Sequence, residues 1–455
     1  MRITGRTSLI VGTYTAVLAV AVLFGTEAAA QNWGNGYYNR AVGGIAIDAQ
    51  GVVQNVSPDA VGALAQAWAR ALGGNPLEID TFSPMRKVSL RGLEAVLREC
   101  IEQNKPIPHE VMYLAGLQRI RYVFVYPEEQ DIVLVGPAEG WKVHPRGMVV
   151  GAKSGRPVML LDDLIVALRS ARNAAQGGMS CSIEPTAEGL SRLQAYVATL
   201  RTIGNPQQTA AAIEQVLGPQ QVLINGVPPE SHFARVLLAA DYRMKSIAMD
   251  LEPSPVKGLP SFMHMLTATG RGMSNMLPRW WLEPNYQPLL RGQNGLAWEL
   301  RGASVRALTE EDYLAANGQK TQTGKASPAA QRWAEIFTEK YDELALAEPV
   351  FGELQNCMDL AIVAALIFKE NLMEKANYHL PVLLDPQVKT TTGPAPKSLA
   401  TVARLMKKGS NWVISASGGV LIQPWAIADN TQLSQEPEKL RPQASPQARK
   451  NWYWN

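Results

Sequence analysis

The spacing of apolar residues alternates between helical and strand-like periods, which predicts a mixed α+β protein. In 91–103 the apolar side chains follow the 3.6-residue period of a helix. Between 119 and 136, two runs rich in Val, Ile, Tyr and Phe flank Pro-Glu-Glu-Gln, which predicts a hairpin. Hairpins mixed with single helices favour short mixed or antiparallel sheets with packed helices over a doubly wound parallel sheet.

Breaks rich in turn residues divide the chain, and 455 residues are too many for one ordinary core. The pattern predicts a signal peptide over 1–30, a linker over 31–42, an N-terminal α+β domain over 43–204, a second α+β domain with a β-meander over 205–312, a flexible loop over 313–327, a helical hairpin over 328–375, a small β or irregular segment over 376–423 and a disordered tail over 424–455. The meander is predicted from four strand-like runs between Arg279 and Leu308. The tail is predicted to be disordered because Gln, Pro and Ser dominate it.

The most strongly patterned helix is HFARVLLAADYRMK, from His232 to Lys245. Its apolar residues fall within one stripe of about 100° on a helical wheel, and its polar residues lie mostly beside or behind that stripe. Asp241 lies at the margin of the stripe, four residues before Lys245, which is a favourable spacing for an ion pair. Because a buried acid must be paired, the pattern favours a structural ion pair of Asp241, with Lys245 or Arg243, over a catalytic role.

The N-terminal region has the pattern of an export signal. A basic start, an apolar stretch over 8–24, and small residues at Ala28 and Ala30 predict a signal peptide cleaved after Ala30, and so a periplasmic or secreted protein. An uncleaved anchor is the alternative, because the apolar stretch nearly reaches spanning length. No membrane span is predicted in the mature chain, since the apolar core Leu360–Phe368 is too short.

Charge and cysteine content exclude several classes of protein. The net charge is +3, of which +1 comes from Arg2, Arg6 and Glu27, so the mature chain has no electrostatic basis for binding nucleic acid or anionic membrane. The three cysteines, at 100, 181 and 357, are far apart and odd in number. They are predicted to be single buried side chains rather than a disulfide framework.

Common catalytic motifs are not matched. The run GQKTQTGKAS has five residues between its glycines and Ala326 after Lys325, unlike a phosphate-binding loop. The five histidines form no H-E-x-x-H, so neither a metal nor a cofactor is predicted. His232, Asp241 and His264 remain as catalytic candidates, for a site assembled from distant residues.

The segment VVGAKSGRPVMLLDDLIVALRSA (149–171) loosely resembles the later half of a PDZ domain. The shared features are a strand, a tight turn, GRPV and a helix that starts with acidic residues. The resemblance implies a site where a peptide adds as an extra strand beside the helix. An ordinary β-β-α packing unit is the alternative, because the carboxylate-binding loop of that domain is not identifiable.

A broader resemblance covers most of residues 43–370. The ordered phrases that carry it are GGIAIDAQGVV, RYVFVYPEEQDIVLVGPAEGWKV, GRPVMLLDDLIVALR, SCSIEPTAEGL, HFARVLLAADYRMK and RWWLEPNY. Together they resemble a family of exported planctomycete proteins built around domain of unknown function 1598. The resemblance implies an exported, uncharacterised protein and carries over no catalytic residue.

Two functions are therefore weighed. The first is a non-enzymatic periplasmic or envelope protein that binds or scaffolds a protein, peptide or polymer through its sheet edges. The second is an exported hydrolase with a site assembled from distant residues. The hydrolase requires His232 or His264 in a concave pocket, within hydrogen-bond reach of a carboxylate and a hydroxyl.

Overall fold

The computed structural model of the chain describes most residues after Val42. The described residues are 42, 45–55, 65–70, 72, 74–200, 205–265, 276–302, 305–314, 320–322, 324–403, 417–447, 449 and 451–455. The predicted signal peptide, and the predicted linker apart from Val42, lie outside these ranges.

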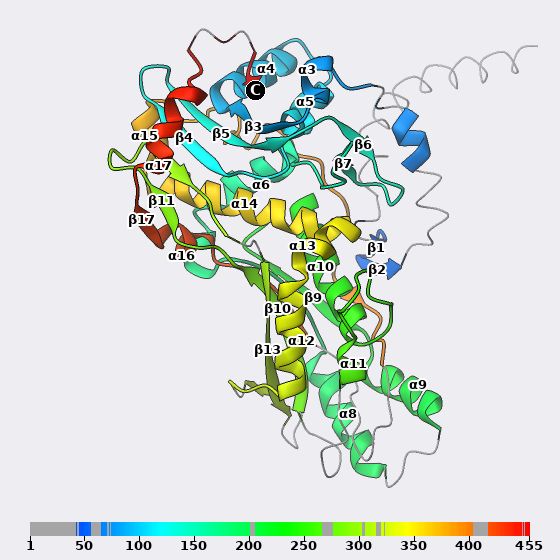
Figure 1. Cartoon of the computed structure of the whole chain (residues 1–455). Coiled ribbons are helices and arrows are strands. Elements are labelled where there is room, and N and C mark those ends of the chain that lie inside the picture. Colours follow the sequence, from blue (N-terminus) through cyan, green and yellow to red (C-terminus); the bar gives the residue numbers. More distant parts are fainter. Residues whose placement is uncertain are drawn as a thin grey trace, which may run out of the picture.

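Two large β-sheets form the framework of the fold (Figure 1). The nine-stranded sheet has the order β1 (Ile45–Ile47), β2 (Val52–Asn55), β15 (Ser398–Leu399), β9 (Gln220–Asn225), β8 (Met179–Glu184), β16 (Ser417–Ile422), β10 (Met276–Pro284), β13 (Val305–Leu314) and β14 (Lys320–Gln322). The seven-stranded sheet has the order β17 (Thr431–Leu433), β11 (Leu289–Arg291), β12 (Ala297–Glu299), β4 (Tyr122–Tyr126), β5 (Asp131–Ala138), β3 (Ser83–Ser89) and β18 (Tyr453–Trp454). Both sheets therefore take strands from distant parts of the chain.

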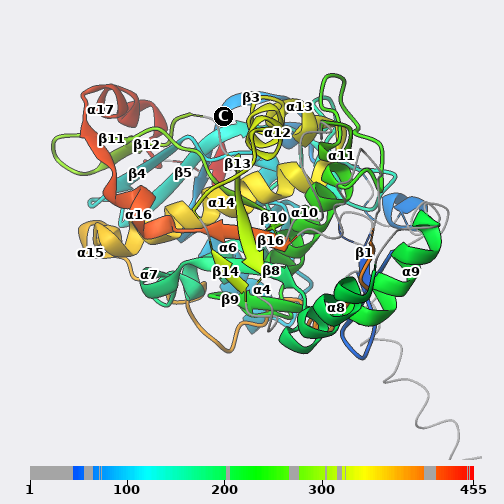
Figure 2. The same cartoon turned by 90° about the horizontal axis from the view of Figure 1, so that it is seen from below.

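Helices cover the sheets and fill the space between them. In chain order they are α3 (Leu77–Asp80), α4 (Leu90–Glu102), α5 (His109–Met112), η1 (Leu114–Gly116), α6 (Leu161–Ser170), α7 (Ala174–Gly177), α8 (Ala187–Thr199), α9 (Pro206–Leu217), α10 (His232–Ala248), α11 (Phe262–Met265), α12 (Pro328–Glu339), α13 (Tyr341–Ala347), α14 (Pro349–Lys369), α15 (Leu372–Ala376), α16 (Pro424–Asp429), α17 (Glu436–Leu440) and η2 (Arg441–Ala444). Figures 1 and 2 show α14 running between the two large sheets. The predicted α+β class is confirmed.

The four strands predicted between Arg279 and Leu308 are present as β10 to β13, but they do not form one meander. Strand β10 pairs with β13 in the nine-stranded sheet, whereas β11 pairs with β12 in the seven-stranded sheet. The chain leaves the first sheet after Pro284 and returns at Val305. This connection joins the two sheets covalently, and the turn residues alone did not reveal it.

The prediction of a disordered tail after Pro424 does not hold for the described residues. The tail forms α16, β17, α17, η2 and β18, and its two strands are the two edges of the seven-stranded sheet. Aromatic anchors explain this order: the Trp425 Nε1–H donates to Ala171 O at 2.6 Å, and Trp454 is buried against the seven-stranded sheet. A few well-placed aromatic side chains thus offset the polar, proline-rich composition.

The β-β-α order predicted for 149–171 is present only in part: the first strand and the helix form, but the second strand, expected around GRPV, does not, and Pro157 makes only an isolated bridge to Val150. Strands β6 (Trp141–Val143) and β7 (Val149–Gly151) form a separate two-stranded sheet, and α6 follows. Helix α6 is buried along most of its length, against α14 and α10. This burial favours the packing-unit alternative, because a PDZ helix leaves one face open to a peptide.

Single buried cysteines were predicted, and all three cysteines are free and buried. The aromatic residues of β10 and β12 are also core residues. Trp280 and Trp298 are fully buried, and Trp280 packs edge-on against Trp333 of α12. Further aromatic contacts run from Trp333 through Phe337 to α14, so an aromatic row links the nine-stranded sheet to the central helix.

Helix α14 is buried from Pro349 to Ile367. The helix has 21 residues, and an 18-residue window of it has a mean hydropathy of 1.5, so it reaches the length and composition of a membrane span, unlike the shorter predicted core Leu360–Phe368. Every residue of that apolar window is nevertheless buried inside the protein, as in the core helix of a globular fold.

Asp359 of α14 links the helix to the segments that lead into two strands of the seven-stranded sheet. Its carboxylate accepts hydrogen bonds from Arg119 Nε at 2.7 Å, Arg119 Nη2 at 3.0 Å and the Ile120 N–H at 3.1 Å, and also from the Tyr286 hydroxyl. Burial raises the pKa of Tyr286, and the Asp359 charge adds to this rise, so the phenol stays a donor. The acid is thus fully paired in the core.

We predict that Asp359→Ala lowers the free energy of unfolding by about 3–5 kcal/mol, because it leaves the Arg119 charge and several buried donors without an acceptor. Urea denaturation followed by circular dichroism measures this change. The matched control is Glu335→Gln, which breaks the exposed Arg332–Glu335 pair and costs less than about 1 kcal/mol. Equal effects of the two substitutions would contradict a linking role for Asp359.

Candidate functional site

The three catalytic candidates from the sequence, His232, Asp241 and His264, do not come together in the structure. His232 and Asp241 both belong to α10, but nine residues of helix separate them by about 13 Å along its axis. His264 lies in the short helix α11, and its side chain is 63% exposed. The three side chains therefore have different surroundings.

Helix α10 begins at His232 because Ser231 caps it, its Oγ accepting a hydrogen bond from the Ala234 N–H at 3.2 Å. The predicted apolar stripe is present, but burial extends around nearly the whole helix. Arg235 and Tyr242, which lie off the stripe, are buried as well. Protein surrounds α10 because β8 and β16 pack on one side and α14 on another.

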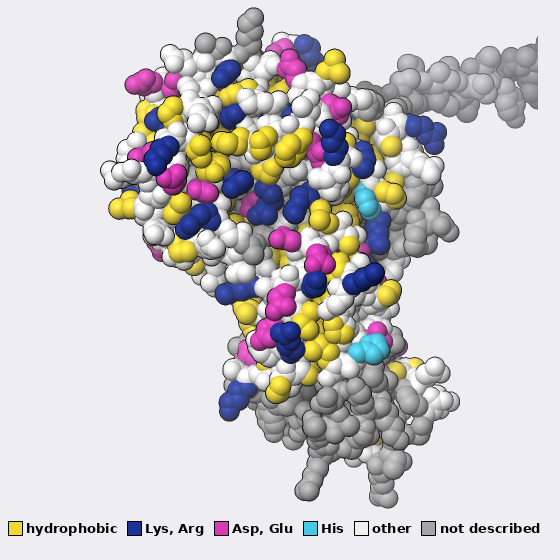
Figure 3. Space-filling view, viewed as in Figure 1, with side chains coloured by type: hydrophobic (Ala, Val, Ile, Leu, Met, Phe, Trp, Pro, Cys, Tyr) yellow, Lys and Arg dark blue, Asp and Glu magenta, His cyan; other side chains and the backbone are white. Residues whose placement is uncertain are grey.

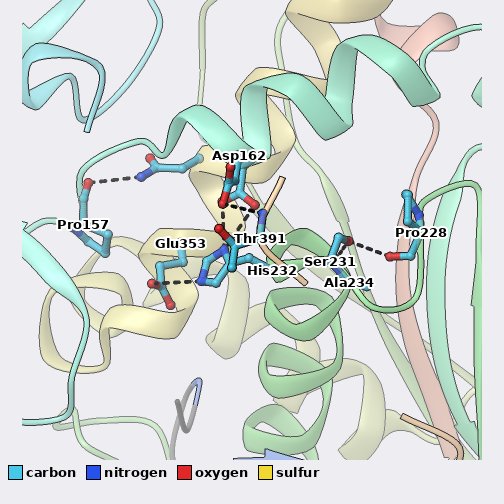
Figure 4. Close-up of polar contacts among 10 residues, drawn as sticks. Pro157, Asp162, Pro228, Ser231, His232, Ala234, Glu353 and Thr391 are labelled. Carbon is cyan, nitrogen blue, oxygen red and sulfur yellow. Dashed lines mark hydrogen bonds and ion pairs between the residues drawn. The ribbon is translucent and has the colours of Figure 1, made fainter. Parts of the chain in front are cut away.

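His232 is held between two carboxylates that come from two other helices (Figure 4). Its Nδ1 lies 3.0 Å from Oδ2 and 3.1 Å from Oδ1 of Asp163 in the first turn of α6. Its Nε2 lies 3.9 Å from Oε1 of Glu353 in α14. The three side chains are 14, 6 and 10% exposed, so the cluster is almost enclosed.

Burial and charge act in opposite directions on this cluster. Burial alone lowers the pKa of His232, but the Asp163 carboxylate, helped by Glu353, outweighs it and raises that pKa to about 9. Burial raises the pKa of Glu353 to about 7, against the opposing pull of His232. Glu353 Oε2 is buried and makes no hydrogen bond with the described residues. At neutral pH the imidazolium is thus stabilised by Asp163, while Glu353 is close to its titration point.

A neighbouring acid, Asp162, holds a loop over the start of α10. Its Oδ2 accepts the Thr391 N–H at 3.2 Å, and burial raises the Asp162 pKa against the effect of the Thr391 hydrogen bonds. The Gly393 N–H donates to Glu230 O at 2.9 Å. The Arg235 guanidinium lies against Gly393, where a Cβ would fall 1.3 Å from Nη2. The cluster therefore joins α6, α10, α14 and the 391–393 loop.

This geometry does not fit general-base catalysis. Imidazole accepts a proton only when neutral, whereas Asp163 stabilises the charged form of His232. Asp163 and Glu353 hold His232 from its two ring nitrogens, in the place where a triad would put one carboxylate and one hydroxyl. Among the described residues, no group of three or more His, Cys, Asp and Glu side chains could hold a metal ion.

His264 has a hydroxyl and a carboxylate nearby, but in the wrong arrangement for a catalytic triad. Ser261 Oγ lies 2.5 Å from His264 Nδ1, and Asp250 Oδ1 lies 3.6 Å from the same nitrogen. A triad requires the nucleophile and the acid on opposite ring nitrogens. Ser261 Oγ also accepts the His264 N–H at 3.3 Å, so it acts as a helix cap.

The predicted ion pair of Asp241 is present. Lys245 Nζ donates to Asp241 Oδ2 at 2.8 Å, and also reaches the Ile183 carbonyl at 3.3 Å and the Gly418 carbonyl at 3.2 Å. Burial raises the pKa of Asp241 to about 6, and Lys245 opposes that rise. Because Ile183 and Gly418 belong to β8 and β16, the pair fastens α10 to the nine-stranded sheet.

A shallow cavity of about 290 Å³ lies elsewhere, between α7, α15, α16 and the end of α14. Its lining includes Arg172, Phe368, Glu374 and Trp425, and the Arg172 guanidinium lies over the Phe368 ring at 5.0 Å. The cavity offers one cation, one acid and two aromatic rings. These groups suit the binding of a small amphipathic group better than catalysis.

Sequence reasoning missed Asp163 and Glu353 as partners of His232. The acidic helix start predicted from the sequence contains Asp162 and Asp163, and the helix dipole accounts for both acids without a histidine partner. Glu353 could have been suspected because it is an acid within the most apolar helix of the chain. Their meeting point could not be inferred, since the three helices lie far apart in sequence.

Comparison with known families and proteins adds one match. The model of a family described as "Protein of unknown function (DUF1598)" matches residues 181–262. This range runs from β8 through α10 to the start of α11, so it contains His232 and Asp241 but neither Asp163 nor Glu353. No curated protein matches the chain, and no solved structure does.

We predict that the protein loses stability as the pH rises from about 5 to 9. Glu353 and His232 both have folded-state pKa values raised above their ordinary values of 4.5 and 6.5. A raised pKa means that protons favour the folded state, so the stabilisation is complete below the ordinary value and is lost as the pH passes the raised one. Glu353 therefore contributes a fall between about 4.5 and 7, and His232 a fall between about 6.5 and 9.

Thermal unfolding at several pH values tests this. Glu353→Gln should flatten the fall between pH 4.5 and 7, because the titrating group is gone. The exposed Glu374→Gln serves as the matched control and should leave the profile unchanged. A Glu353→Gln profile identical to that of the unaltered protein would rule out the assignment.

Proposed function

We propose that the protein is an exported, non-enzymatic binding or scaffold protein of the cell envelope. The observation that carries this proposal is the state of His232. The best catalytic candidate is almost enclosed and held between Asp163 and Glu353, where it connects helices instead of facing a nucleophile. Export is supported by the N-terminal sequence pattern, with cleavage after Ala30.

The hydrolase alternative has less support. A general base must be neutral at the working pH and must reach the proton that it removes. His232 has its pKa raised to about 9, and His264 meets Ser261 and Asp250 at a single nitrogen. Neither histidine supplies the arrangement that hydrolysis by a serine or threonine nucleophile requires.

A protein, peptide or polymer of the envelope is the proposed partner. Positive, negative and apolar side chains are interspersed on the face shown in Figure 3. Such a surface suits a protein partner better than nucleic acid, which selects basic surfaces. The edge strand β17 is exposed throughout, and its Leu433 is 67% exposed. Exposed edges accept an additional strand through their backbone groups.

We predict that the mature chain, tagged and returned to intact envelopes, captures a partner that Leu433→Lys captures poorly. A charge on an edge strand disfavours strand addition. Leu346→Lys is the matched control, because Leu346 is 46% exposed but lies in α13. Quantitative mass spectrometry of the captured material measures both. Recovery of no partner from intact envelopes would refute the binding role.

The processed N-terminus provides a separate test of export. Protein recovered from the envelope or the medium should begin at Gln31, because Ala28 and Ala30 suit a signal peptidase. Terminal peptide mapping by mass spectrometry identifies the first residue. Recovery of a chain that still carries 1–30 would instead support the anchor alternative.

A further inference from the structure

The last described segment of the chain reaches the edge of the seven-stranded sheet opposite β17. We call residues 451–455 the strap. Figure 1 shows the described chain ending beside β3 and α4, at the point marked C. The edge between β3 and the first turn of α4, residues 86–92, is the β3–α4 groove. The strap occupies this groove as an added antiparallel strand.

Backbone contacts hold the strap as they would hold a bound peptide. Tyr453 lies opposite Val88 and Trp454 opposite Lys87 in the antiparallel ladder. The Ser89 N–H donates to the Trp452 carbonyl at 2.8 Å. Main-chain hydrogen bonds of this kind supply the affinity when a peptide adds to a sheet edge.

A buried arginine side chain binds the last residue of the strap. Arg86 Nε donates to Asn455 Oδ1 at 2.8 Å. The other end of the same guanidinium is fixed by the carbonyls of Ile79 and Ala115, at 3.1 and 2.7 Å from Nη1. The donor that meets Asn455 is therefore preorganised, which lowers the cost of binding a segment there.

The side-chain fit depends on a glycine in α4. A Cβ on Gly92 would lie 2.8 Å from the Trp452 Cβ and 3.1 Å from its Cα, so only glycine lets the strap backbone lie this close to the helix. Trp454, two positions further on, is buried with Tyr122 and Phe124, whereas Trp452 packs against the main core cluster. The groove thus accommodates an extended segment that packs its two tryptophans against separate parts of the core.

The strap is tethered by a stretch with local bonds. Among the described residues 445–449, the Ser445 N–H donates to Pro442 O, Gln447 N–H to Ser445 Oγ, and Arg449 N–H to Pro446 O. Gln447 and Arg449 are exposed. The hydrogen bonds of these described residues are local, so the chain can change direction here without breaking one to the sheets, as strand exchange between copies requires.

We infer that the β3–α4 groove is a strand-accepting site, and that its partner is the strap of a second copy of this chain. This inference rests on the proposed binding or scaffold function and names one partner for it. When the strap of a second copy occupies the groove, it makes the same ladder, the same Arg86 contact and the same tryptophan packing. Exchange therefore keeps all of these contacts. Exchange in both directions makes a closed pair, whereas exchange in one direction joins copies into a chain.

Two full-length variants of the mature chain test exchange by complementation. Gly92→Ala is the donor: its new Cβ excludes its own strap, and alanine is at least as favourable as glycine inside a helix. Trp452→Ala/Trp454→Ala is the acceptor, with an intact groove and a weakened strap. Each variant alone should be monomeric, and their mixture should form a one-to-one complex by size-exclusion chromatography with light scattering.

The control is the Gly92→Ala/Trp452→Ala/Trp454→Ala variant, which should form no complex with either partner. Circular dichroism confirms that each chain is folded. Should the acceptor not fold, Trp454→Ala alone replaces it. A mixture of folded donor and acceptor that stays monomeric overturns the inference. The envelope capture with Leu433→Lys concerns the opposite edge of the sheet, so its result is independent of this one.

Discussion

The complete burial of α14 is the constraint on which the rest of the structure depends. A helix enclosed by protein must pair every acid that it carries, because an unpaired buried charge is strongly destabilising. The acids at its start and along it find partners in different elements: Glu348 with Arg146 and Arg243, Glu353 with His232, and Asp359 with Arg119 and Tyr286. These pairs fix α10, the β6–β7 connection and the seven-stranded sheet around one helix, so the two large sheets share one core.

The same constraint accounts for the shifted pKa values without requiring an active site. Strongly perturbed groups often cluster at catalytic centres, but structural ion pairs perturb pKa values as well. His232, Glu353 and Asp241 all show such shifts, and each makes a contact between a helix and another element. The proposed binding function accordingly uses the surface. There the tail after Pro424 supplies both edges of the seven-stranded sheet, one exposed and one held by aromatic side chains.

Much of the local structure could be predicted from residue patterns. The hairpin of β4 and β5, the capped start of α10 and the Asp241–Lys245 pair follow from short-range rules, because each involves neighbours in sequence. The tail and the split of β10 to β13 between two sheets could not be predicted. Both depend on distant partners. Trp454 packs on a sheet whose central strands lie some 300 residues earlier, and the residue pattern of a strand does not specify which sheet the strand joins.

By itself the sequence determined the element types, the α+β class, the isolated buried cysteines and the absence of common catalytic motifs. These depend on composition and on periods of two or 3.6 residues, which are local properties. Only the tertiary structure decided that His232 meets Asp163 and Glu353, and that Gly92 makes room for Trp452. Those contacts join segments separated by 69 to 360 positions, and their positions are set by how whole helices and sheets pack around α14.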